Sequence, residues 1–300
     1  MANQGVSVLP VEIAHAANEG DKARVIARLV SGGSIDARCD RSEGNLGSTL
    51  IINCVCGLRG GVWQNEFHIG DRQLALAREL VLCGANVNTP EVSKGDAPLH
   101  CLLRSTLHGH RERRGDPPQA SLDMLSLLLK APGSNINVRN EDGETPLYLA
   151  IAGQEPSELS VTLVTELLRA GVSLDACLTG GGQTDRHRWL VEIRLFHTAE
   201  DILQDLESEW FTARHRQDWQ EGGFSISCCH FDAIKALVHG VREHGSYKCY
   251  ARRLHRDVLA VRGLALRGKL STEDPVLKFL VSAPLHGVCW KILSYWRATD

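Results

Sequence analysis

The chain has 300 residues, a net charge of −3 with neutral histidines, 43% apolar residues and 23% charged residues. This balance is typical of a globular protein and excludes a fibrous or wholly disordered chain. Residues 1–20 lack the basic start and apolar block of a secretory signal, and the longest uncharged apolar run, residues 50–58, is too short to cross a bilayer. We therefore expect an intracellular, cytoplasmic protein without a transmembrane segment.

The first expected elements are two helices separated by a glycine. Residues 11–19 form an apolar stretch that ends at Gly20, and a second helix follows through Val25 and Leu29. The segment Gly32-Gly33-Ser34-Ile35-Asp36 then closes the pair, because glycine accepts the left-handed backbone that ends many helices. The same ending recurs at Gly84–Asn88, Gly133–Asn137 and Gly171–Asp175.

A second motif opens the later helix pairs. Its fullest copy is Asp142-Gly143-Glu144-Thr145-Pro146-Leu147-Tyr148-Leu149-Ala150. Gly143 suits a turn with positive φ, Thr145 is the expected N-cap, and Pro146 fits the first helical turn, where its missing N–H is not needed. Earlier copies contain Gly47 and Gly95, and each glycine precedes the next by 48 residues.

The second helix of each pair shows apolar residues at helical spacing. We interpret these stripes as core faces. They are Leu76, Leu80 and Val81; Leu122, Leu125, Leu128 and Leu129; and Leu163, Val164, Leu167 and Leu168.

The openings and endings together resemble the ankyrin repeat family, whose repeats open with Gly-x-Thr-Pro-Leu-His-x-Ala and end with Gly-Ala-x-Val-Asn. Tyr148 stands at the histidine position of the fullest copy, and His100 occupies it in the preceding unit. The resemblance implies that this histidine ties turns together by hydrogen bonds. Because an ordinary repeat spans about 33 residues, the longer spacing implies insertions at residues 59–70 and 105–120, which we expect to be loops.

The expected fold is all-α. Residues 10–178 would form an ankyrin-type helix-pair solenoid of about four units with long intra-repeat insertions. Residues 179–230 would be a degenerate repeat or cap, since Gly182–His187 keeps only part of the opening motif and terminal units tolerate polar replacements. Helices at residues 189–196 and 198–211 are candidates for this cap, and residues 231–300 would form a helical C-terminal domain.

The ankyrin resemblance implies a protein–protein interaction module or scaffold that binds a protein partner through a concave surface of turns and first helices. The sequence does not identify that partner. The candidate partner-binding residues lie in the turns and near the ends of the first helices. They are Asp40, Arg41, Lys94, Asp96, Arg104, Arg139, Glu141, Asp142, Glu144 and Gln154.

The C-terminal region differs in charge from the repeats. Residues 235–300 contain twelve basic and five acidic residues, whereas residues 1–178 contain sixteen basic and twenty-one acidic ones. The expected basic element is a helix over residues 247–269, in which Tyr250, Leu254 and Val258 begin an apolar stripe and the arginines fall off it. Such a basic face could serve nucleic acid or an anionic membrane, or simply keep the surface solvated.

The end of the chain suggests an alternative function. A helix around Val258 and Leu266, a break at Ala283–His286 and a final amphipathic helix up to Trp296 resemble a SOCS box. This resemblance implies a substrate-recognition adaptor of a ubiquitin ligase. The simpler alternative is a helical domain that packs on the last repeat.

The sequence contains no clear catalytic or metal-binding pattern. Cys54-Val55-Cys56 and Cys228-Cys229-His230 are the densest groups among ten cysteines, and neither has the paired C-x-x-C spacing of a zinc site. We interpret the cysteines as buried, reduced thiols. Gly180–Gly182 lacks the lysine of a P-loop. We therefore expect no metal, no cofactor and no enzymatic activity.

Overall fold

The computed structural model describes residues 8–39, 47–56, 69–113, 119–152, 156–175, 178–179, 196–207 and 228–268. The chain divides into two compact units, Met1–Val238 and His239–Asp300. The described residues are mostly helical, with four two-residue strands, which confirms the all-α prediction. Within these residues no helix is long and apolar enough to span a bilayer.

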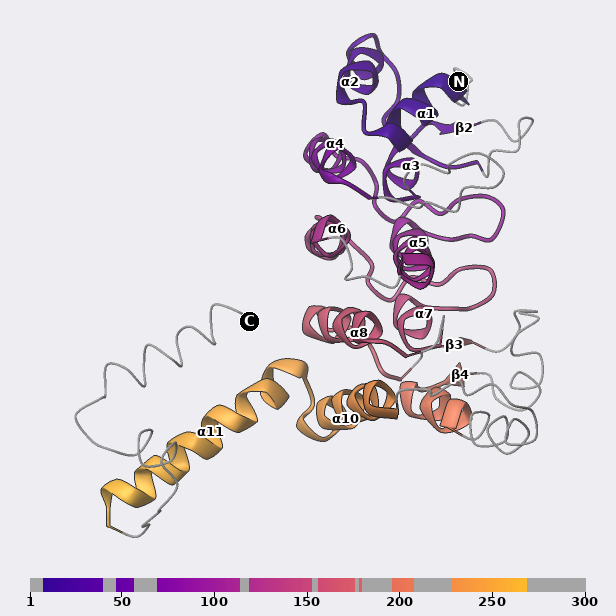
Figure 1. Cartoon of the computed structure of the whole chain (residues 1–300). Coiled ribbons are helices and arrows are strands. Elements are labelled where there is room, and N and C mark those ends of the chain that lie inside the picture. Colours follow the sequence, from indigo (N-terminus) through magenta and orange to yellow (C-terminus); the bar gives the residue numbers. More distant parts are fainter. Residues whose placement is uncertain are drawn as a thin grey trace, which may run out of the picture. The chain divides into compact units, whose positions relative to one another are not determined.

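Eight helices of the first unit form four consecutive pairs (Figure 1). The first helices are α1 (Val11–Glu19), α3 (Leu50–Cys56), α5 (Pro98–Arg113) and α7 (Pro146–Ala152), and the second helices are α2 (Lys22–Val30), α4 (Asp71–Leu82), α6 (Gln119–Lys130) and α8 (Glu158–Ala170). Each first helix contacts the next first helix, and each second helix contacts the next second helix. The first helices therefore make one row and the second helices a neighbouring row.

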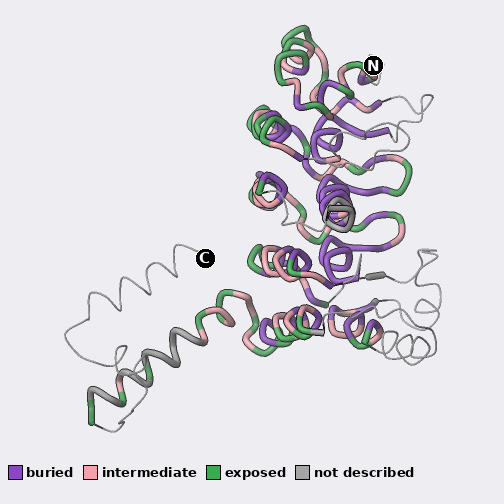
Figure 2. Tube along the Cα trace, in the orientation of Figure 1, coloured by how far each residue is buried: buried purple, intermediate pink, exposed green. Residues whose placement is uncertain are grey.

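The core lies along the row of first helices and the adjoining side of the second helices (Figure 2). All seven residues of α7 are buried, whereas α4 buries one side through residues such as Leu76 and Leu80. The predicted stripe of α8 is buried in full. Val81, Leu122 and Leu129 are only half-buried, so the stripes of α4 and α6 are narrower than predicted.

The predicted helix ends are confirmed. Gly20 ends α1 with φ 71°, and the glycines of the four endings also have positive φ. Thr145 is the N-cap of α7, because its hydroxyl accepts the N–H of Tyr148 at 3.3 Å, and Pro146 is the first helical residue.

A ladder of side-chain hydrogen bonds connects the endings of consecutive pairs. The fifth residue of one ending accepts the backbone N–H of the third residue of the next. These bonds run from Asn86 to Asp36 (2.9 Å), from Asn135 to Asn88 (2.8 Å) and from Ser173 to Asn137 (2.8 Å). Because the same bond recurs at the same position, neighbouring endings keep one relative geometry.

Two small strand pairs were not predicted from the sequence. β1 (Val8–Leu9) pairs in parallel with β2 (Arg38–Cys39), and β3 (Leu178–Thr179) pairs antiparallel with β4 (Phe196–His197). Each strand has two residues, which is too short for an alternating apolar pattern to be recognised.

The prediction of a loop at residues 105–120 is wrong for residues 105–113, which continue α5, and for Gln119 and Ala120, which begin α6. Leu107 is buried within this stretch, no proline occurs between Pro98 and Pro117, and arginine and glutamate are good helix formers. Residues 114–118 and residues 59–68 of the other predicted insertion lie outside the described residues. Ile69 and Gly70 directly precede α4.

The region after α8 agrees with the predicted cap only in part. Phe196 belongs to β4, so the helix predicted there is wrong at this residue, while residues 189–195 lie outside the described part of the chain. Residues 199–207 are helical, as predicted. Thr198 and Asp201 cap this helix reciprocally, since each side chain accepts the backbone N–H of the other at 3.1 and 2.9 Å.

Helix α10 (Cys228–His244) follows and contains the division between the two units. Its Lys235 forms an ion pair with Glu207 at 2.6 Å within the first unit. The second unit continues with α11 (Tyr247–Leu266), which confirms the predicted helix at residues 247–269 nearly to its end. Residues 269–300 lie outside the described residues, and so do the break and final helix of the SOCS-box-like pattern.

Candidate protein-binding surface

Two neighbouring turns carry most of the predicted site residues. The turn Glu91–Asp96 precedes α5 and is closed by a hydrogen bond from the Glu91 N–H to the Asp96 carbonyl at 2.9 Å. The turn Asn140–Glu144 precedes α7 and is closed in the same way at 3.2 Å. The Glu141 N–H donates to the Lys94 carbonyl at 2.9 Å. This bond holds the two turns side by side.

Glu91 stabilises the first turn from inside. Its side chain is buried, and its carboxylate accepts hydrogen bonds from the Ser93 N–H (2.9 Å), the Ser93 hydroxyl (2.7 Å) and the Lys94 N–H (2.6 Å). Burial alone would raise the pKa of Glu91, but the hydrogen bonds favour the charged form and bring its pKa below the ordinary value. The Glu91 carboxylate is therefore charged and holds the first turn through these hydrogen bonds.

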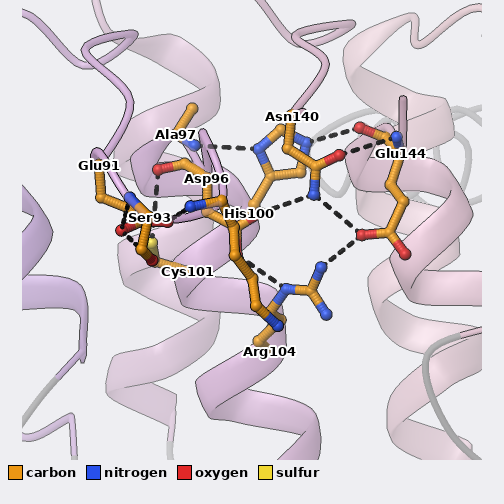
Figure 3. A network of polar contacts seen from close by, with 10 residues as sticks. Glu91, Ser93, Asp96, Ala97, His100, Cys101, Arg104, Asn140 and Glu144 are labelled. Atoms are coloured by element: carbon orange, nitrogen blue, oxygen red, sulfur yellow. Dashed lines mark hydrogen bonds and ion pairs between the residues drawn. The ribbon is translucent and has the colours of Figure 1, made fainter. Parts of the chain in front are cut away.

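A network of five polar side chains, which we call the turn network, joins the two turns to α5: Asp96, His100, Arg104, Asn140 and Glu144 (Figure 3). Arg104 donates from Nε to Asp96 at 2.9 Å and pairs through its second terminal nitrogen with Glu144. The Asn140 amide donates to the same two carboxylates, at 2.7 and 2.9 Å. Asp96 and Glu144 are each only 5% exposed. Two buried carboxylates thus share one guanidinium and one amide.

Asp96 and Glu144 stabilise the charged form of the Arg104 guanidinium. Burial alone would lower the pKa of Arg104, but Asp96 and Glu144 raise it above the ordinary value. The Arg104 side chain keeps 38% of its surface exposed, so the guanidinium connects the buried carboxylates to solvent. A paired and hydrogen-bonded arrangement of this kind is the condition under which buried charges are tolerated.

His100 links its own helix to the next turn. Its Nδ1 accepts the Ala97 N–H at 3.1 Å, so the proton of the neutral ring is on Nε2, which donates to the Glu144 carbonyl at 3.0 Å. Burial lowers the pKa of His100 and outweighs the charge of Asp96, which acts in the opposite direction. The imidazole is therefore neutral, and it ties the two turns together as expected for this position.

The predicted site residues fall into three groups. Asp96, Arg104 and Glu144 meet in the turn network, where the two carboxylates are buried and hold the turns instead of facing a partner. Lys94, Arg139 and Glu141 are exposed on the turns, and Asp142 is half-exposed. Asp40, Arg41 and Gln154 lie outside the described residues.

The sequence interpretation missed Glu91 and Asn140 as structural residues. One signal for the network was present, since an acidic residue follows the opening glycine in two consecutive units, as Asp96 and Glu144. Stacked units place such equivalent positions next to each other. Two adjacent buried carboxylates need a compensating positive charge. Arg104, which lies more than one helical turn into α5, supplies it.

The cysteines differ from the prediction. Cys39, Cys54 and Cys101 are buried, but Cys83, Cys229 and Cys249 are exposed, so the interpretation as buried thiols is wrong for these last three. Burial raises the pKa of the Cys54 thiol well above its ordinary value, which keeps it protonated. Across the described ranges, no group of three or more His, Cys, Asp or Glu side chains is arranged to hold a metal ion.

No protein-family model matches the chain, and no curated protein matches its sequence. The function is therefore inferred from the arrangement of the residues alone. That arrangement is a rigid pair of turns whose inner carboxylates and imidazole are occupied by hydrogen bonds, with charged side chains exposed at the tips.

Proposed function

We propose that residues 10–178 are an ankyrin-type solenoid and that its turns and first helices bind a protein partner. Three observations support this assignment: the two rows of helices, the equal spacing of the opening glycines and the ladder between Asp36, Asn88 and Asn137. A stack of similar helix pairs is held together by contacts between neighbours and leaves an extended surface for binding.

The turn network is the observation that carries the proposal. Lys94, Arg139 and Glu141 are exposed. Lys94 and Glu141 lie on neighbouring turns, and a hydrogen bond between their backbones joins these turns. Arg104 is partly exposed and held by two carboxylates. Side chains on a rigid backbone lose less conformational entropy on binding. Arginine is also enriched among the few residues that dominate interface energies.

The alternative of a ubiquitin-ligase adaptor depends on residues 247–300, of which residues 269–300 lie beyond the described residues. None of the described contacts favours it. The binding module is thus the function that the geometry supports best.

Affinity capture from a cell lysate tests the proposal with three versions of the full chain. The first is unchanged, the second carries Lys94→Glu with Glu141→Lys, and the third carries Glu19→Lys with Arg72→Glu. Both double variants preserve net charge and exchange exposed side chains, but Glu19 and Arg72 lie at the end of the helices away from the turns.

We expect specific partners to be captured by the unchanged chain and the third version and lost from the second. Partners retained by all three versions would contradict the assignment to the turns. Circular dichroism of each version checks that the helices remain folded.

A further inference from the structure

Two cysteines on neighbouring first helices lie in contact with each other. Cys56 is the last residue of α3, and Cys101 lies near the start of α5. The two helices pack against each other, and the Cys56 and Cys101 side chains are hydrogen-bonded. Both are reduced thiols. The turn network uses neither of them.

The contact is restricted to this pair of thiols. Cys54 is also on α3, but residues two positions apart on a helix do not face each other. Within the described residues, no group of three or more His, Cys, Asp or Glu side chains is arranged around a common point, whereas a structural zinc ion takes four ligands. Covalent bonding between the two sulfurs is therefore the chemistry that their placement favours.

The surroundings give the two thiols different roles. Cys101 is 8% exposed, and its Sγ donates to the Asp96 carbonyl at 3.7 Å. Its hydrogen bond with Cys56 and its burial raise the pKa of Cys101 well above the usual value, and the charges of Asp96 and Glu91 act in the same direction. Cys101 is thus held protonated, whereas a thiolate is needed for attack. Cys56 is only half-buried, so a small oxidant reaches the pair from its side.

We infer that Cys56 and Cys101 are a site of reversible oxidation, at which a peroxide produces a disulfide between α3 and α5. The Cys56 thiolate attacks one peroxide oxygen, which forms an S–O bond, breaks the O–O bond and leaves a sulfenic acid. The Cys101 sulfur then attacks the Cys56 sulfur. The S–S bond forms as the S–O bond breaks, and the departing hydroxide takes the Cys101 proton and leaves as water. Two thiols lose two electrons, and hydrogen peroxide is reduced to two water molecules.

The disulfide adds a covalent link between two helix pairs that contacts between neighbours otherwise hold together. The link lies beside the first turn, because Cys101 donates to the same Asp96 carbonyl that closes this turn by accepting the Glu91 N–H. Oxidation therefore acts on the stack next to the turn network. The formation of the disulfide does not depend on partner binding by the turns.

Peptide mapping of the full chain tests this inference. The reduced chain is treated with a small molar excess of hydrogen peroxide, the remaining thiols are alkylated, and the digest is analysed by mass spectrometry without reductant. A parallel reaction contains dimedone, which traps sulfenic acids. The test variants are Cys56→Ala and Cys101→Ala. The control is Cys83→Ala, which removes an exposed cysteine at the end of α4.

We expect the unchanged chain and the control to give a peptide that joins Cys56 to Cys101 and that dithiothreitol separates. Cys101→Ala should lose this peptide and accumulate the dimedone adduct at Cys56. Cys56→Ala should leave Cys101 reduced, because Cys101 is buried and protonated. A folded, unchanged chain without the Cys56–Cys101 peptide would overturn the inference, whichever other cysteines are oxidised. Equal oxidation of Cys101 with and without Cys56 would overturn it as well.

Discussion

At the scale of single residues, Arg104 of α5 makes the most consequential described contacts with the two turns. It neutralises part of the charge of Asp96 and Glu144, both 5% exposed, and reaches solvent with its own side chain. Removing one partner of a buried pair costs more than the pair contributes, because the remaining charge loses its compensation.

The substitution Arg104→Met tests this role. It keeps the apolar stem but leaves the two carboxylates without their cation. We expect the free energy of unfolding to fall by about 2–4 kcal/mol, below the full cost of a buried pair since Arg104 is partly solvated. Urea denaturation measures it, with Arg78→Met as the exposed control. Equal midpoints for the two variants would show that the network does not stabilise the fold.

His100 predicts a dependence of stability on pH. Its pKa is lowered in the folded chain by burial, whereas in the unfolded chain it is about 6.5. As pH falls below about 6.5, the unfolded chain takes up a proton at this position before the folded chain does, so the free energy of unfolding decreases. The neutral imidazole thus stabilises the folded chain fully above about pH 6.5. This stabilisation is lost as the pH falls towards the lower pKa that His100 has in the folded chain.

The comparison of His100→Gln with the unchanged chain isolates this effect. Between about pH 6.5 and 5, we expect a shallower loss of stability in the variant, because the titrating group is absent. Urea denaturation at several pH values gives the slopes. The exposed His15, replaced by Gln, is the control. Parallel slopes for all three proteins would contradict the assigned direction of the pKa shift.

Residue roles set by the local backbone were predictable from the residues themselves, the role of His100 was expected only through the family resemblance, and the distant partners of Arg104 were not predicted. Gly143 and Thr145 could be assigned from the sequence because their functions depend on the next few residues. Arg104 meets Glu144 across 40 positions, and His100 meets the same residue across 44. Such contacts follow only from the way consecutive units stack.

At the scale of helices and turns, the errors have two origins. The polar stretch after Ser105 was interpreted as a loop, although its residues favour a helix and Leu107 anchors it in the core. The polarity of these residues alone therefore led to a helical segment being interpreted as an insertion. The four strands were missed because two-residue pairings depend on a neighbouring segment and not on their own sequence.

Two glycines provide a matched test of how tightly the turns are joined. Gly84 and Gly95 have φ of 88° and 69°, so alanine is strained at both. A Cβ at Gly84 meets nothing within 4 Å, but at Gly95 it would lie 2.9 Å from the Glu141 Cγ and 3.0 Å from the Glu141 nitrogen. That nitrogen cannot retreat without losing its hydrogen bond to Lys94.

We expect Gly84→Ala to cost about 1 kcal/mol of stability through backbone strain alone. Gly95→Ala should lower the free energy of unfolding clearly more than Gly84→Ala does, because its Cβ also pushes Glu141 and the second turn away from the first. Chemical denaturation measures both values, and amide hydrogen exchange at Glu141 should accelerate only in the second variant. If both variants lose the same stability, the two turns are not rigidly joined.

At the scale of the whole molecule, the order of the helices along the chain is also their order in space within the first unit. Helix α6 contacts α4, α5 and α8, but no comparable contact joins it to α1 or α2 within the described residues. In a linear stack, stability is approximately a sum of the units and of the interfaces between neighbours. A globule with one shared core would instead lose stability everywhere when any core residue is truncated.

The substitution Leu128→Ala distinguishes these two architectures. Leu128 is 1% exposed in α6, and truncating it should cost about 2–5 kcal/mol of local stability. In hydrogen exchange monitored by mass spectrometry, we expect protection to fall in α4, α5, α6 and α8 and to persist in α1 and α2, because disruption spreads only through neighbouring interfaces. Leu82→Ala, at a side chain that is 80% exposed, is the control and should change no segment. Uniform loss of protection from α1 to α8 would contradict a stack of semi-independent units, and with it the extended surface on which partner binding by the turns depends.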